Sequence, residues 1–221
     1  MAGPHENLEH AEHAQHAAHE GGSHNKQIAL IISVLALFLA FSETFGKSAQ
    51  TAALNAQIEA SNLWNFFQAK NIRRTMTLVA TDMAKLDATI ATQENHKAAL
   101  AKQIDTWTKT ADRYRSEPEA GGGKGEGTKE LSERAQAMEK VRDHELNKYH
   151  NFEFASAAFQ IGIVLASAAV ITGMMILAYA AIGVGVVGLA LTGTGLLMPE
   201  FLHDAMHWFA ALFAGGGGAH H

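Results

Sequence analysis

Cysteine is absent from this chain of 221 residues, and proline occurs only three times. Without cysteine there are no disulfide bonds and no thiolate chemistry. Neither glycine nor proline, the residues that most often interrupt helices, occurs between Gly46 and Pro118. That interval is instead rich in alanine, glutamine, lysine and leucine. The chain is therefore predicted to be all-α.

Another interval of the chain lacks charged residues. Residues 155–198, a run of 44, contain no Asp, Glu, Lys or Arg. A bilayer core of about 30 Å is crossed by roughly 20 apolar residues in a helix, so this run fits two crossings joined by a tight hairpin. In lipid every backbone polar group must be paired, which requires helices there.

A third crossing is predicted near the amino terminus, over residues 26–46, after a polar tail at 1–25. An apolar core that follows a lysine also resembles a signal peptide. The long acidic lead argues against cleavage, as do Glu43 and Lys47 where small residues would be needed. An uncleaved anchor is favoured. The sequence thus predicts an integral membrane protein with three transmembrane helices.

The polar interval 47–154 is predicted to be a soluble domain with a long coiled-coil hairpin, divided by a flexible, glycine-rich linker at 116–127. Its signature is an apolar stripe with steps of three and four residues. Twelve positions form the stripe: Met76, Val79, Met83, Leu86, Ile90, Gln93, Lys97, Leu100, Ile104, Trp107, Ala111 and Tyr114.

The length of this domain predicts a reversal of the chain. A single straight helix over 47–115 would be about 104 Å long, more than the following residues can retrace before the second crossing. Gln93 and Lys97 interrupt the apolar stripe, so Thr92–His96 is the predicted site of reversal. Strong tilt of the helix, or a first segment that lies along the membrane, would also account for the difference in length. A return helix is expected from Thr128, with a weaker stripe at Leu131, Ala135, Met138, Arg142, Tyr149 and Phe152.

Apolar, mostly aromatic residues lie next to basic ones in the first half of the soluble domain. They are Leu63, Trp64, Phe66 and Phe67, followed by Lys70, Arg73 and Arg74. Such a mixture suits a membrane headgroup surface. The same aromatic side chains would also pack against the opposite helix of a hairpin. Packing is the favoured interpretation.

Histidine is concentrated at the two ends of the chain. His10, His13, His16 and His19 lie in the amino-terminal tail, and His203 and His207 lie in the amphipathic tail at 199–221. Imidazole binds zinc, copper and nickel when two or more ligands are within reach. For the amino-terminal tail, a solvated segment that gains charge below about pH 6.5 is the simpler interpretation, with weak divalent-metal binding as the alternative. For His203 and His207, a surface pair at the membrane edge is favoured over a pair of metal ligands.

No set of catalytic residues is recognisable, so an enzyme is not expected. The basic residues of the middle are balanced by acids, which leaves no surface for nucleic acid. Small residues in the last crossing, including Gly185 and Gly188, allow helices to approach closely. They serve either hairpin packing or self-association, and the two roles are compatible.

The segment Trp64-Asn65-Phe66-Phe67-Gln68-Ala69-Lys70, followed by Ile72 and Arg73, resembles a bacterial membrane family known as domain of unknown function 4337. The His-rich tail LEHAEHAQHAAHE and the order of crossings resemble it as well. The chain departs from that family by an uncharged turn between its last two crossings and by a tail after Pro199. The resemblance implies a bacterial inner membrane and no particular activity.

Two functions are therefore considered. The first is a non-enzymatic membrane scaffold or assembly subunit that binds the lipid bilayer, has no resident cofactor and forms homo-oligomers. The second is a metal- or pH-responsive sensor that uses the His-rich tail. Basic residues near the ends of the soluble domain favour its cytoplasmic placement. The residues predicted to make the contacts of the scaffold are Trp64, Phe67, Met83, Leu86, Ile90, Leu100, Ile104, Trp107, Gly185 and Gly188.

Overall fold

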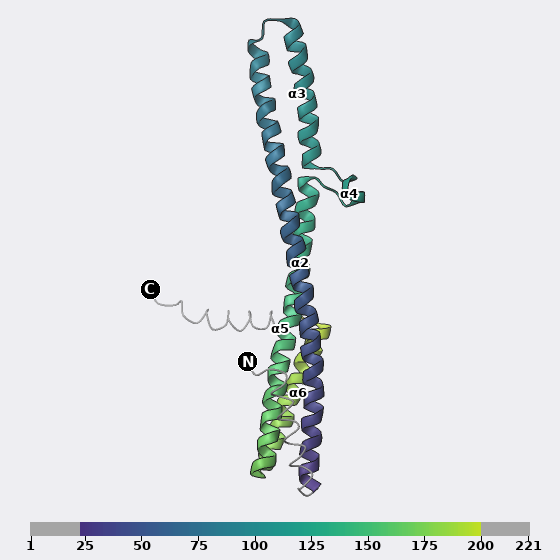
Figure 1. Cartoon of the computed structure of the whole chain (residues 1–221), viewed down its shortest axis with the longest axis vertical. Coiled ribbons are helices and arrows are strands. Elements are labelled where there is room, and N and C mark those ends of the chain that lie inside the picture. The colour runs from purple at the N-terminus through teal and green to yellow at the C-terminus, as the bar shows by residue number, and fades with distance from the viewer. Residues whose placement is uncertain (1–22, 200–221) are drawn as a thin grey trace, which may run out of the picture. The chain divides into compact units, whose positions relative to one another are not determined.

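The computed structural model describes residues 23–199. The elements are α2 (Ser23–Ile90), α3 (Glu94–Arg115), α4 (Ala120–Gly123), α5 (Thr128–Thr172) and α6 (Met175–Leu197), as Figure 1 shows. No strand occurs among the described residues, which confirms the all-α prediction. Both predicted tails fall mostly outside this range.

Three of the helices, α2, α5 and α6, are long and apolar enough to cross a membrane, by length and composition. Each of the three predicted crossings coincides with part of one of them. Helices α5 and α6, which contain the last two predicted crossings, are separated only by Gly173 and Met174. Gly173 has φ of 70°, a left-handed conformation that favours glycine, and its N–H donates to the carbonyl of Ala169 at 2.9 Å.

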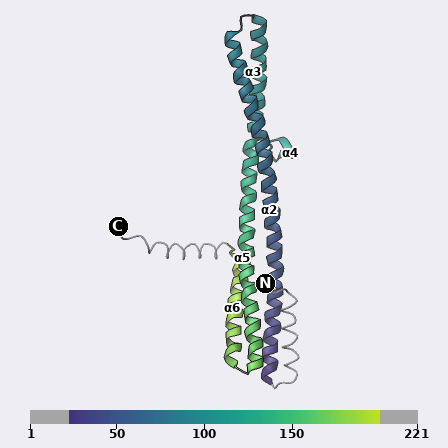
Figure 2. The ribbon, with the colours of Figure 1, turned by 60° about the vertical axis from the view of Figure 1, so that its left-hand side comes forward.

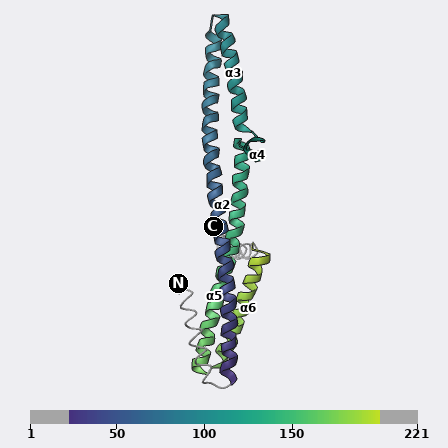
Figure 3. The ribbon, with the colours of Figure 1, turned by 45° about the vertical axis from the view of Figure 1, so that its right-hand side comes forward.

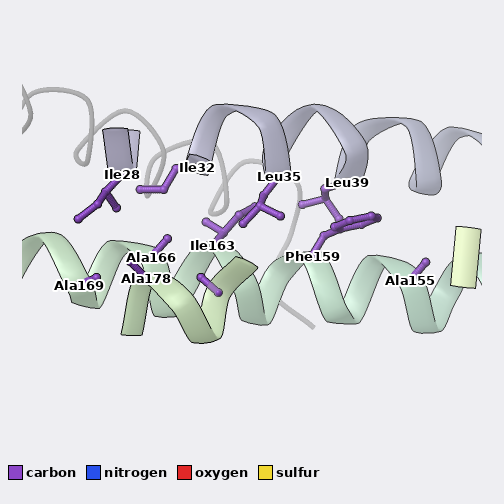
Figure 4. Packing of buried hydrophobic residues seen from close by; sticks show 11 residues of the cluster. Ile28, Ile32, Leu35, Leu39, Ala155, Phe159, Ile163, Ala166, Ala169 and Ala178 are labelled. Atoms are coloured by element: carbon purple, nitrogen blue, oxygen red, sulfur yellow. The ribbon is translucent and has the colours of Figure 1, made fainter. Parts of the chain in front are cut away.

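The described residues divide into two compact units. Unit 1 contains residues 23–53 and 143–199, and within it α2, α5 and α6 lie side by side (Figure 2). Figure 4 shows side chains of α2 directed at those of α5 in its core. The core residues are Ile28, Ile32, Leu35, Leu39, Ala155, Phe159, Ile163, Ala166, Ala169, Ala178 and Ala181.

Helix α2 buries one face along nearly all of its length, with steps that alternate between four and three residues. We call this face the inner stripe. In unit 1 it begins with large apolar residues and continues with small ones, so that neighbouring helices can approach closely. Its members are Ile28, Ile32, Leu35, Leu39, Ser42, Gly46, Ala49 and Ala53 in unit 1, and Ala56, Ala60, Leu63, Phe67, Lys70, Arg74, Thr77, Thr81, Ala84 and Ala88 in unit 2.

Unit 2 spans Leu54–Arg142, inside the predicted soluble domain. Helix α2 ends at Ile90, residues 91–93 are not helical, and α3 then lies alongside α2 (Figure 3). This break overlaps the predicted reversal at Thr92–His96. The first part of α5 also packs on α2, through a cluster of Leu63, Leu131 and Ala135.

Residues 116–127, which connect α3 to α5, are joined by several hydrogen bonds. The N–H of Glu126 donates to the carbonyl of Glu117 at 3.1 Å, and that of Gly125 donates to the carbonyl of Ala120 at 3.0 Å. The composition of this segment predicts a flexible linker. In the structure, hydrogen bonds between backbone groups connect the two ends of this segment. Four of its glycines have positive φ.

Candidate interaction surfaces

Between residues 72 and 90, the side of α2 that faces away from the inner stripe carries six large apolar residues, which we call the outer stripe. Their steps also alternate between four and three residues, so they form one continuous face. Each side chain is at least half exposed in the single chain. The outer stripe contains Ile72 (57%), Met76 (67%), Val79 (50%), Met83 (64%), Leu86 (66%) and Ile90 (73%).

The predicted twelve-residue stripe is thus divided by the break at 91–93. On α3, Leu100, Ile104 and Trp107 are half-buried on the side where Ala111 is buried. Met83, Leu86 and Ile90 of α2 are exposed. The chain reverses between these groups, so the α3 residues lie in a packed face of unit 2 and the α2 residues do not.

Trp64 and Phe67 take part in the packing of unit 2. Packing is the interpretation that the sequence favours for these aromatic residues. Both rings contact the group formed by Leu63, Leu131 and Ala135. The two rings meet edge to face, with centroids 5.4 Å apart. The indole N–H of Trp64 donates to Oε1 of Glu139 at 2.8 Å, so this half-buried polar atom has a partner.

Lys70 is the one basic residue of the inner stripe that forms ion pairs with the connection between α3 and α5. Its Nζ lies 3.2 Å from Oε2 of Glu117 and 3.7 Å from Oε2 of Glu126, while its side chain is only 8% exposed. The ammonium also lies 5.4 Å from the centroid of the Phe66 ring. Two carboxylates and an aromatic face therefore compensate the burial of this charge. The sequence prediction did not identify this role.

Glu130 of α5 binds the first residues of the same connection. Its carboxylate accepts hydrogen bonds from the hydroxyl of Ser116 and from the N–H of Glu117. Desolvation by burial raises the pKa of Glu130, but these hydrogen bonds lower it, and the net pKa lies below the ordinary value. Glu130 therefore stays ionised at neutral pH and keeps both donors satisfied.

In unit 1, Gly185 and Gly188 of α6 are buried against the other helices. A Cβ atom built on Gly185 would lie 2.6 Å from Cδ2 of Leu35, and one built on Gly188 would lie 2.8 Å from Cε1 of Phe159. These contacts explain both glycines by packing within the chain. A Cβ on Gly183, by contrast, would meet nothing within 4 Å.

Replacing Gly188 by alanine is expected to destabilise unit 1 by about 1–2 kcal/mol, because the rigid Phe159 ring cannot move aside without disturbing its neighbours. Thermal unfolding of the detergent-solubilised protein measures the change. Gly183→Ala in the same helix is the matched control. It should be neutral or slightly stabilising, because alanine favours helix over glycine. Equal losses in both variants would contradict this assignment.

The predicted metal ligands His10, His13, His16, His19, His203 and His207 lie outside the described residues. Within residues 23–199 there is no group of three or more His, Cys, Asp or Glu side chains placed to hold a metal ion. Metal binding by the tails therefore stays a prediction. Calorimetry with Zn²⁺, Cu²⁺ and Ni²⁺ against a variant with a scrambled tail tests it.

The fold and its surfaces define an all-helical protein with three helices apolar enough to cross a membrane. The chain belongs to the family described as Domain of unknown function (DUF4337), whose model matches residues 24–198. The match includes both units of the structure and the segment Trp64–Lys70 that carries the resemblance. No curated protein and no solved structure matches the chain.

Proposed function

We propose that this protein is a non-enzymatic scaffold or assembly subunit of a bacterial inner membrane, and that it forms homo-oligomers. Unit 1 supplies the helices that cross the bilayer. Unit 2 supplies a helical surface in water, through which copies of the chain associate as a coiled coil. No cofactor is needed for this role.

The outer stripe is the observation that carries the proposal. Scattered exposed apolar residues are common on soluble proteins, but a continuous apolar face marks a binding surface. Here six such residues follow one heptad pattern, from Ile72 to Ile90. The inner stripe of the same helix already supplies the contacts within the chain. A second helix from another molecule is the partner that heptad spacing suits.

Unit 1 supports the membrane part of the proposal. Its outward side chains are large and apolar on all three helices, for example Leu37 (54%), Val164 (57%) and Val186 (58%). Lipid tails would cover these residues. Gly183 and Gly193 of α6 have open space around them and offer a second place where helices of different copies can approach closely.

Cytoplasmic placement of unit 2 is the orientation that we propose. Basic residues flank the crossings on that side, whereas Lys26 is the single basic residue at the opposite end of the first crossing. A reporter fused at Gly123, in the connection between α3 and α5, tests the orientation. Activity of a periplasmic reporter at this position would contradict the cytoplasmic placement.

Replacing Leu86 by lysine is expected to weaken self-association at least tenfold, because each interface would bury a charge where an apolar side chain had been. Native mass spectrometry and chemical cross-linking of the full chain in mild detergent measure the oligomer. Ala101→Lys, at an exposed position of α3, is the control and should leave it unchanged. A monomer for the unmodified chain at all concentrations would overturn the scaffold proposal.

A further inference from the structure

The outer stripe is the second half of a longer face of α2 that contains no charged residue. On the side away from the inner stripe, the steps of three and four residues continue toward the amino terminus through unit 2. We call these positions the uncharged face, and all of them are exposed in the single chain. They are Asn55, Ile58, Asn62, Asn65 and Ala69, followed by the six residues of the outer stripe.

The composition of this face differs from that of the rest of the helix. Every charged residue of α2 within unit 2 lies off the uncharged face, and these residues are Glu59, Lys70, Arg73, Arg74, Asp82, Lys85 and Asp87. The face of a helix that meets water normally carries charged and polar residues. Asparagine is also a weak helix former, so helix stability does not explain three exposed asparagines inside a long helix. The uncharged face is therefore suited to contact with another protein surface.

We propose that the uncharged face pairs with the same face of a second copy of the chain, parallel and in equal register, along residues 55–90. The inference rests on the proposed function and adds the direction, register and extent of the contact. A two-fold axis parallel to the helices relates the two copies. Such an interface is self-complementary, and each residue of the face meets its own counterpart.

The direction of the pairing follows from the continuity of α2. This helix runs without a break from Ser23 to Ile90 and contains the first predicted crossing. Copies inserted in one bilayer with the same orientation therefore present the helix in the same direction and at the same height. Two such helices can pair along the same residues only in parallel and in equal register.

The asparagines in the first half of the face favour equal register. Asn55 and Asn62 occupy a positions of the heptad repeat, and Asn65 occupies a d position. In equal register each amide meets its own counterpart, and an amide can both donate and accept a hydrogen bond. A shift by one heptad would place Asn62 against Ala69 and Asn65 against Ile72, which would leave buried amides without partners. Asparagine at an a position fixes the register of coiled coils in this way.

One repeated pair of like charges flanks the contact. In the parallel pair, Asp82 of one copy lies beside Asp87 of the other. The carboxylate of Asp82 is 3.0 Å from Nζ of Lys85 on the same helix, which offsets part of the repulsion. At another flanking position, Arg73 lies beside the neutral Gln68. The flanking charges therefore lower the affinity of the dimer without preventing its formation.

The extent of the face also indicates a contact of moderate strength. Residues 55–90 of a helix are about 52 Å long, about twice the length of the outer stripe. A strip of this length and one helix wide, roughly 10–12 Å, covers roughly 500–600 Å² on each copy. The total of roughly 1,000–1,200 Å² lies at the lower limit for specific interfaces. Confinement of both copies to one membrane raises their effective concentration and favours pairing.

Thiol cross-linking tests direction and register, because the native chain contains no cysteine. Asn62→Cys and Leu86→Cys, two single variants of the full chain, sample the two halves of the face. They are expressed separately, and together with different tags, and the membranes are treated with a short bifunctional thiol reagent. Each position meets its own counterpart in the parallel pair, whereas positions 62 and 86 are about 36 Å apart along the helix. We expect strong cross-linking of each variant alone and almost no mixed dimer.

Asn71→Cys is the matched control for these variants. Asn71 is exposed on the same helix, next to Ile72, but it lies off the uncharged face. It should cross-link only at the rate of random collision. If either test variant cross-linked no more than this control while native mass spectrometry still showed an oligomer, the pairing would be wrong and the scaffold proposal would stand. Mixed dimers as abundant as the self-linked ones would also overturn the register, and a monomeric native chain would overturn both proposals.

Charge reversal at Asp87 provides a second readout, which is a gain in affinity. Asp87→Lys replaces both like-charged pairs with Asp82 by pairs of opposite charge, so the dimer should become about tenfold tighter. Asp112→Lys makes the same change of charge at an exposed position of α3 and should leave the dissociation constant unchanged. Analytical ultracentrifugation in detergent measures the dissociation constants, and circular dichroism confirms that each variant is folded. Unchanged or weaker association of Asp87→Lys would show that Asp82 and Asp87 do not face each other, and the proposed register would be wrong.

Discussion

Replacing Leu131 by alanine is expected to lower the free energy of unfolding of unit 2 by about 3 kcal/mol. Leu131 is 0% exposed and forms the centre of the cluster with Leu63 and Ala135. Truncation removes apolar burial and leaves a cavity beside Trp64 and Phe67, and such changes cost about 2–5 kcal/mol. Hydrogen exchange of the amides of unit 2 in the full chain measures the loss.

Val141→Ala is the matched control for this variant. Val141 belongs to the same helix and the same unit, but its side chain is 44% exposed. Its truncation should change the stability by less than about 0.5 kcal/mol. If Leu131→Ala were as mild as Val141→Ala, the first part of α5 would not be packed on α2 as the structure shows.

The division of residues 155–198 between two helices could be predicted from the sequence because it depends on strong signals. The uncharged run at 155–198 is too long for one crossing, and its turn falls at Gly173, where the backbone requires positive φ. The reversal near Thr92–His96 followed from chain length together with the interruption at Gln93 and Lys97. Both arguments rest on geometry and on charge, which are independent of detailed packing.

The faces of α2 could not be predicted in the same way, because this helix carries two heptad patterns. The outer stripe has large apolar residues and dominates any hydrophobicity pattern. The inner stripe of unit 2 contains Thr77, Thr81 and Ala84, which are common on either face of a helix. Thr81 is nonetheless only 1% exposed. Its hydroxyl can be buried because it donates to the carbonyl of Thr77 at 2.7 Å and needs no other partner.

Lys70 shows a second limit of sequence patterns. A lysine is rarely buried without a partner, so its position in an apolar repeat indicates an interruption of the packing. The structure supplies partners from Glu117 and Glu126, which are more than forty residues away in sequence. The loop between α3 and α5 brings them together. The glycine-rich composition of that loop indicates flexibility and gives no sign of these contacts.

Replacing Phe159 by alanine is expected to destabilise unit 1 by about 2–3 kcal/mol. The ring is 0% exposed, stacks on Phe38 with centroids 6.0 Å apart and lies against Gly188. In the proposed membrane setting the hydrophobic transfer term is small, so the loss comes from the cavity and from the packing of three helices. Phe154→Ala, at a 46% exposed position of the same helix, is the control and should have little effect. Thermal unfolding in detergent compares the two variants. Equal effects would show that Phe159 contacts lipid or detergent and not α2 and α6, and the proposed three-helix membrane unit would then be wrong.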